Sequence, residues 1–198
     1  MLSEIFFSAL LAAVMTLVGS LWIDRLYRTS DELSFPKKIS ARAKFRRPIL
    51  FFALTILICA AQNFWQVTAI FLLMLMTATD FEQYMLFDAM TFPLAIIGAV
   101  CAWHGDFFDC ALAACVGGGI FLLLAIISRG ALGGGDIKLI FALGFWLGTE
   151  KLLDTILAGT IAGGVAALLM LLAKQKDRDS YIAYGPYLAL SAIYFLLK

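Results

Sequence analysis

Long apolar runs, broken only by short polar stretches, make up most of this 198-residue chain. Hydrophobic residues account for 63% of it and charged residues for 15%, whereas soluble domains are about 45–50% apolar and about 25% charged. A water-soluble fold of this size could not bury so much apolar surface. The composition therefore excludes a soluble enzyme, a disordered tail and a fibrous protein, and it indicates an integral membrane protein.

The apolar runs predict an all-α protein with about eight transmembrane helices, each needing about 20 mostly apolar residues. The expected spans are 3–23, 48–61, 64–79, 86–103, 107–127, 136–147, 152–173 and 182–197. Gln62 and Asn63 should break the second apolar run; the alternative is a seven-span protein in which residues 48–79 form one tilted helix. We expect residues 1–63 to form an N-terminal two-span region and residues 64–198 a six-span core.

Basic residues fall mainly on one side of this map. Thirteen of the 15 Lys and Arg lie on one face, and only Lys151 and Lys198 lie on the other. The positive-inside rule makes the basic face cytoplasmic and places both termini outside the cytoplasm. Eight of these cations lie in the loop at residues 24–47, which we expect to lie on the membrane and bind anionic headgroups.

Two acidic residues stand where the predicted spans reach the cytoplasmic face. Asp80 ends the apolar run that begins at Phe64, and Asp136 directly follows three glycines at residues 133–135. Ionisable groups at membrane depth are costly and mark functional sites by default. The glycines should leave the backbone unwound beside a small cavity, so that the two carboxylates can face each other. The alternative is that each aspartate is an ordinary helix cap at the membrane interface.

The cysteines and the single histidine do not predict a metal site. Cys59, Cys101, Cys110 and Cys115 form no C-x-x-C pair, and most lie in apolar stretches, where a free cysteine acts as a small hydrophobic residue. A disulfide between Cys101 and Cys110, across the outer loop that holds His104, is the alternative.

Three motifs in order along the chain carry a resemblance to a known family. They are TDFEQYMLFD at residues 79–88, GGGDIKL at 133–139 and YGPYLAL at 184–190. Together they resemble the type IV prepilin peptidases, which are membrane aspartyl proteases with a GxGD motif. The resemblance implies that Asp80 and Asp136 are the catalytic pair and that Asp88 has a supporting role. It also implies substrate-binding positions at Gly133, Gly135, Lys138, Tyr184, Gly185 and Pro186.

The same resemblance implies an aspartic endopeptidase in a prokaryotic cell membrane. Its substrate would be a type IV prepilin or pseudopilin, whose basic leader it removes at the cytoplasmic face, with no cofactor and no nucleic-acid partner. Bifunctional members carry two C-x-x-C pairs in the first cytoplasmic loop and methylate the product with S-adenosylmethionine. This loop has no cysteine, so methylation and S-adenosylmethionine binding are not expected.

Two other functions remain open from the sequence. Paired intramembrane acids and broken helices also suit a small proton- or cation-coupled transporter or scaffold, although no inverted repeat is visible. A presenilin-like GxGD protease with another substrate is the second alternative. Its first motif would pair a tyrosine with the aspartate, whereas Thr79 precedes Asp80 here.

Overall fold

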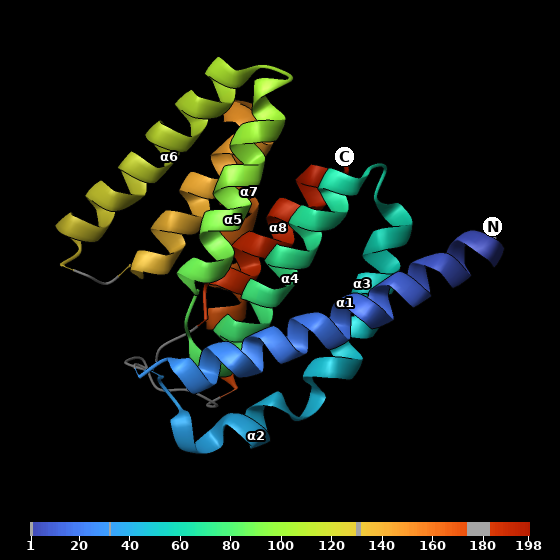
Figure 1. Cartoon of the computed structure of the whole chain (residues 1–198). Helices are drawn as coiled ribbons and strands as arrows, with labels where there is room; N and C mark the ends of the chain where they lie inside the picture. Colours follow the sequence, from blue (N-terminus) through green and yellow to red (C-terminus); the bar gives the residue numbers. More distant parts are fainter. Residues whose placement is uncertain (1, 32, 130–131, 174–182) are drawn as a thin grey trace.

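The computed structural model describes residues 2–31, 33–129, 132–173 and 183–198, and its regular elements over these residues are all helices (Figure 1). The predicted all-α class is therefore confirmed. The long helices are α1 (Leu2–Thr29), α3 (Arg46–Ala60), α4 (Phe64–Gln83), α5 (Asp88–Trp103), α6 (Phe107–Ile127), α7 (Gly134–Leu172) and α8 (Gly185–Leu197). A four-residue helix, α2 (Ile39–Arg42), lies between two 3-10 turns, Pro36–Lys38 and Ala43–Phe45.

The chain breaks between α3 and α4 where the sequence predicts it. Ala61 is extended, and the Asn63 side chain accepts a hydrogen bond from the Gln66 backbone N–H at 2.9 Å, which caps α4. An asparagine cap satisfies one of the free N–H groups at a helix start. The seven-span alternative, with one helix over residues 48–79, is therefore wrong.

Helix α7 consists of two helical segments joined at Gly148. This glycine has φ 69° and ψ −176°, a conformation that L side chains rarely adopt. The second segment starts at Thr149, whose backbone N–H donates to the Asp109 carboxylate of α6 at 2.9 Å. The predicted end at Leu147 is confirmed, but the predicted loop at residues 148–151 shrinks to a single residue because Asp109 caps the next segment.

Other predicted boundaries move by several residues. Helix α1 continues to Thr29 instead of ending at residue 23, and Arg46 already belongs to α3, so the first loop is shorter than predicted. Polar contacts between the end of α1 and Arg46, described below, stabilise this extension. Helix α5 begins at Asp88 rather than at residue 86. The predicted start of the last span, Ile182, lies outside the described residues. So do three basic residues of the preceding loop: Lys174, Lys176 and Arg178.

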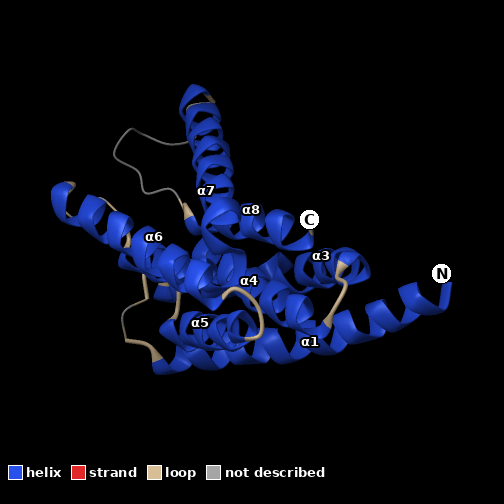
Figure 2. Ribbon diagram, turned by 90° about the horizontal axis from the view of Figure 1, so that it is seen from above, coloured by secondary structure: helices blue, strands red, loops and turns tan. Residues whose placement is uncertain are grey.

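Helix α4 lies at the centre of the molecule, between α7 and α8 on one side and α1 and α5 on the other (Figure 2). Its Ile70, Leu75 and Met76 have no exposed surface. Small residues bring other helices close, since a Cβ on Gly144 of α7 would overlap the backbone of Ala114 in α6. Among the described residues, four helices, α1, α4, α6 and α7, are long and apolar enough to cross a membrane, and large apolar side chains cover the outer faces. The fold is that of a multi-pass membrane protein.

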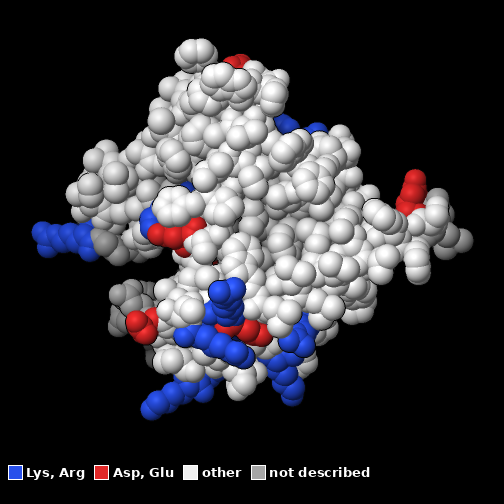
Figure 3. Space-filling model, viewed as in Figure 1, with Lys and Arg blue, Asp and Glu red and all other residues white. Residues whose placement is uncertain are grey.

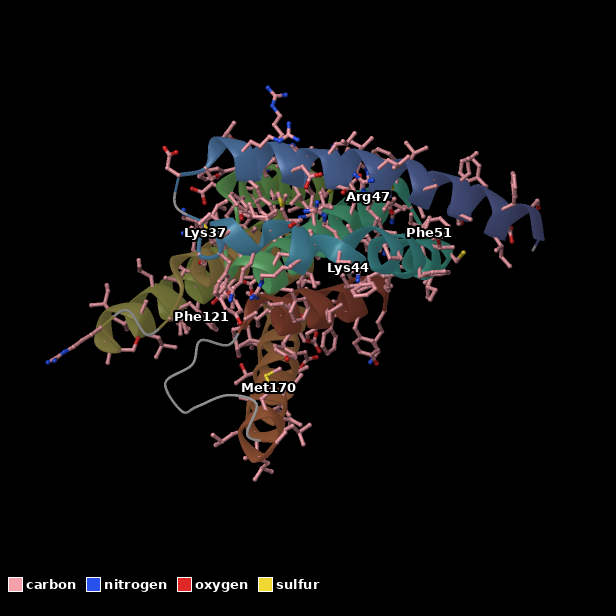
Figure 4. The ribbon with its side chains drawn as sticks, turned by 90° about the horizontal axis from the view of Figure 1, so that it is seen from below. Lys37, Lys44, Arg47, Phe51, Phe121 and Met170 are labelled. Carbon is pink, nitrogen blue, oxygen red and sulfur yellow. The ribbon has the colours of Figure 1, made fainter. Side chains whose placement is uncertain are left out.

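Charge is segregated along the molecule. In Figure 3 most Lys and Arg side chains on this face gather at the lower end, beneath a broad band with few charges. The same end carries α2 and the end of α1 in Figure 1. Seen from below in Figure 4, Lys37, Lys44 and Arg47 lie along the short helices and the start of α3.

Candidate active site

Asp80 lies in the last turn of α4 and is almost fully buried, with 6% of its surface exposed. The helix ends at Gln83, and the next residue, Tyr84, has φ 55° and donates its backbone N–H to the Asp80 carbonyl at 2.9 Å. Left-handed backbone costs a residue other than glycine about 1–2 kcal/mol, and such strain clusters at functional sites. The turn at Tyr84 leads the chain across residues 85–87, beside Asp80, and into α5.

Asp136 lies in the first turn of α7, and its backbone N–H donates to the carbonyl of Gly133 at 3.1 Å. Gly134 and Gly135 are helical, so the prediction that the glycines leave the backbone unwound is wrong for these two. Gly135 instead allows a close approach, because a Cβ there would lie 2.8 Å from Cβ of Leu86. The missing side chain lets the start of α7 pack directly on the turn that follows α4.

The two aspartates line one cavity of about 230 Å³, as the sequence predicts for two acids at the same depth. Tyr84, Met85, Leu86 and residues 133–135 complete its lining. The Oδ2 atom of Asp80 is buried and has no hydrogen-bond partner among the described residues. Buried polar atoms are normally paired, so this oxygen is free to bind a water molecule or a polar group of a substrate. Helix capping alone explains neither the shared cavity nor the unpaired oxygen.

The third sequence motif, at residues 184–190, meets Asp80 at the start of α8. Gly185 and Pro186 form the buried first turn of α8, and a Cβ on Gly185 would lie 2.8 Å from Oδ2 of Asp80. The Tyr184 hydroxyl lies 2.6 Å from Oγ1 of Thr160, in the second segment of α7. None of these three residues, for which the resemblance implies substrate binding, is among those that line the cavity. In this structure the motif meets Asp80 through Gly185.

Asp88 and Lys138 form an ion pair that joins the starts of α5 and α7. The Lys138 Nζ lies 2.7 and 2.8 Å from the two carboxylate oxygens of Asp88, and each side chain is about half exposed. Exposed ion pairs contribute only about 0–1 kcal/mol to stability. Neither residue lines the cavity, so these two predicted site residues contact each other rather than Asp80 and Asp136.

A buried polar cluster, which sequence reasoning missed, lies two residues beyond Asp80. We define the Arg46 cluster as Asp24, Tyr27, Arg46 and Glu82, from α1, α3 and α4. Glu82 Oε2 accepts hydrogen bonds from the Tyr27 hydroxyl and from Nη1 of Arg46, both at 3.0 Å, and Arg46 also pairs with Asp24. Arg46 therefore points into the protein rather than toward headgroups, contrary to the expectation for the 24–47 loop.

The first loop, between α1 and α3, is attached to the end of α4. The Phe35 backbone N–H donates to Oε1 of Gln83 at 2.8 Å, and an Arg42 Nη donates to the Phe81 carbonyl at 2.8 Å. The Arg42 guanidinium also stacks 4.2 Å from the centre of the Phe35 ring and 5.3 Å from that of Tyr84. The loop thus braces the turn that lines the cavity, which the expectation of a purely membrane-bound loop did not include.

The cysteines are all free thiols, so the Cys101–Cys110 disulfide alternative is not formed in this structure. Within the described parts of the chain, no three His, Cys, Asp or Glu side chains lie close enough together to hold a metal ion. The acids that do converge are the Asp80–Asp136 pair. Two carboxylates from different helices of a multi-pass membrane protein share a small cavity, and acids placed in this way can share a proton.

Residues 67–168, about half of the chain, match the type IV leader peptidase family, and the chain belongs to that family. Among its relatives are prepilin leader peptidase/N-methyltransferases of Xanthomonas campestris pv. campestris, 30% identical over 66% of this chain and 48% of the relative, and of Pseudomonas aeruginosa, 31% identical over 67% and 50%. A third, from Neisseria gonorrhoeae, is 35% identical over 59% of this chain and 42% of the relative. The chain thus spans about half the length of the curated relatives it matches.

The family match covers the first two motifs and ends before the third, at residues 184–190. It includes Asp80 and Asp136, together with Asp88 and Lys138. Family membership weighs against the transporter and the presenilin-like alternatives. No solved structure gives a significant match to this chain.

Proposed function

We propose that this chain is an aspartic endopeptidase that removes the basic leader peptide of type IV prepilins or pseudopilins. The single observation that carries the proposal is the unpaired, buried Oδ2 of Asp80 in a cavity that Asp136 also lines. Membership of the type IV leader peptidase family supports the same reaction class. The catalytic residues in this proposal are Asp80 and Asp136.

The proposed reaction is hydrolysis without a covalent intermediate. Like charges close together in a site of low dielectric constant resist simultaneous ionisation, so one carboxylate holds a proton and the other is ionised. The ionised carboxylate takes a proton from a water molecule as that water attacks the scissile carbonyl. The protonated carboxylate donates its proton to the carbonyl oxygen, and the two exchange roles when the tetrahedral species breaks down. We assign the proton to the pair rather than to one residue.

The proposed orientation puts the dyad and the first loop at the cytoplasmic face, in a cell membrane of a prokaryote. Eight spans then result if α1, α3, α4, α5, α6, the two segments of α7, and α8 each cross the bilayer. The support is the separation of basic residues to one end of the molecule. A reporter fused after Lys198 should read as extracytoplasmic, and one inserted in the first loop as cytoplasmic. A cytoplasmic carboxyl terminus would contradict the eight-span arrangement.

Cleavage without methylation is the second part of the proposal. The region 1–63 would be a reduced counterpart of the methyltransferase part of bifunctional enzymes, and residues 64–198 the peptidase core. The support is the absence of any cysteine from the loop at residues 24–47, where a metal-binding knuckle would need four thiolates. Cleavage itself would then need no cofactor.

The experiment is co-expression with a prepilin in a host that has no other leader peptidase, followed by mass spectrometry of the processed amino terminus. We expect loss of the leader and an unmodified amine. An intact leader would contradict the peptidase proposal. A product heavier by one methyl group, in the presence of S-adenosylmethionine, would contradict the proposal on methylation while leaving the peptidase intact.

A further inference from the structure

An apolar groove of about 490 Å³ lies between α5, α6 and the first segment of α7. Phe92 of α5, Cys115 and Gly119 of α6, and Ile137 and Phe141 of α7 are among the residues that line it. Helix α6 runs away from α5 and α7 toward its carboxyl-terminal end in Figure 1. Cys115, Gly119 and Leu122 of its lining are exposed, so the groove opens on the side of the helix bundle.

The groove and the catalytic cavity are lined by neighbouring residues at the start of α7. Residues 133–136 line the cavity, and the next two residues of the same helix turn, Ile137 and Lys138, line the groove. Of the described residues that line the groove, Lys138 alone is charged, and its ion pair with Asp88 joins the starts of α5 and α7. The start of α7 thus contributes residues both to the cavity and to the groove.

One side of α6 is open where it faces the groove. A Cβ on Gly119 would meet no atom within 4 Å, and Cys115, one helical turn earlier, is also exposed. The neighbouring Gly117 and Gly118 differ, because a Cβ on them would press against Leu152 and Phe141. Small residues one turn apart allow another helix to approach closely in a membrane. The helix thus packs inward with one pair of small residues and presents another pair outward.

We infer that this groove holds the apolar helix that follows the scissile bond of the prepilin substrate. The inference rests on the proposed function, because the resemblance to prepilin peptidases implies a substrate whose basic leader precedes an apolar helix. Because the start of α7 lines both the cavity and the groove, the end of that helix next to the leader would lie near Asp80 and Asp136. The apolar lining suits the body of the helix, and the open backbone at Gly119 accepts its close approach.

The first test fills the groove without disturbing the fold. Gly119→Leu places a side chain in open space, and Gly164→Leu, at an exposed α7 glycine whose Cβ would also meet nothing within 4 Å, is the matched control. Overpacking at a contact of this kind should raise KM for the full prepilin about 10-fold in Gly119→Leu, with kcat little changed. A short soluble peptide that carries the leader and only a few following residues should be cut equally by both variants and by the unchanged chain.

The second test detects the helix in place. In an Asp80→Asn background, which keeps the substrate intact, Cys115 is retained as the single cysteine and joined by a bismaleimide to a cysteine in the apolar helix of the prepilin. The matched control retains only Cys59, an exposed thiol on α3. We expect cross-linking through Cys115 and not through Cys59.

The outcomes separate the groove from the function on which it depends. An unchanged KM in Gly119→Leu, or equal cross-linking through Cys59 and Cys115, would overturn the groove assignment while cleavage persists. Failure of the unchanged chain to cut either substrate would instead overturn the proposed peptidase function.

Discussion

Two acidic residues near the end of α4 are equally buried but have opposite surroundings. Asp80 and Glu82 are 6% and 5% exposed. Glu82 accepts hydrogen bonds from Arg46 and Tyr27, whereas Oδ2 of Asp80 has no partner among the described residues. Residues two apart point to different sides of a helix, so one side of α4 meets α1 and α3 while the other meets the starts of α7 and α8.

The contrast shows how one helix end serves both anchoring and chemistry. A buried charge is costly unless it is paired and hydrogen-bonded, and the Arg46 cluster meets that requirement for Glu82. Asp80 does not meet it, and departures from local satisfaction are characteristic of functional sites. The Arg46 cluster and the loop contacts of Gln83 hold the turn in place, so that Oδ2 of Asp80 can remain without a hydrogen-bond partner.

The largest expected effect comes from replacing either aspartate of the candidate catalytic pair. Asp80→Asn and Asp136→Asn should each lower prepilin cleavage by about 10³–10⁴-fold or more, because each removes a group that transfers a proton. Both variants should still fold, since a neutral amide is less costly to bury than a charge. Cleavage is measured by loss of the leader with purified protein. Asp154→Asn, an exposed acid in α7, is the control and should retain full activity.

The next largest effect comes from removing the cation of the Arg46 cluster. Arg46→Met should lower the free energy of unfolding by about 3–5 kcal/mol, because it leaves Glu82 buried without its cation. Arg46→Met combined with Glu82→Met should recover most of that loss, since no buried charge remains. Unfolding in detergent measures both. Arg25→Met, at an exposed position in α1, is the control, and equal stability of Arg25→Met and Arg46→Met would show that the cluster does not anchor the helices.

A smaller effect is expected from crowding Oδ2 of Asp80, the oxygen without a hydrogen-bond partner. Gly185→Ala puts a methyl group 2.8 Å from Oδ2 of Asp80, so the carboxylate must move. Misplacement of a reacting group by about 1 Å can cost about 10²-fold, and we expect kcat to fall by that order while KM for prepilin changes little. Gly164→Ala, with nothing near its Cβ, should leave kcat unchanged. Equal kcat values in the two variants would contradict the supporting role of Gly185.

Much of the candidate site could be predicted from the sequence, because the positions of its two aspartates follow from the predicted transmembrane spans. Asp80 ends one apolar run and Asp136 begins another, and both runs reach the same face, so their meeting in one cavity follows from topology. The glycines before Asp136 are also readable as a close approach. Which residue the glycines contact, Leu86, could not be predicted, because it depends on how two helices distant in sequence pack together.

Other features depend on contacts that no local pattern contains. Tyr84 adopts a left-handed conformation that usually belongs to glycine or asparagine, so nothing in its sequence marks the end of α4. Arg46 is one of eight cations in and around the first loop, and only the approach of α1 and α4 selects it as the partner of Glu82. Asp109 caps the second segment of α7 from another helix, which explains why the predicted loop after Leu147 is absent.

The most direct test of a shared dyad compares the two single variants with the double variant Asp80→Asn/Asp136→Asn. Residues that act as one unit are strongly non-additive, so removing both should cost no more than removing either. We expect the three proteins to show the same residual cleavage of purified prepilin, at equal amounts of folded protein. Substantial cleavage by either single variant, or a double variant whose loss is the product of the two single losses, would contradict a shared catalytic pair.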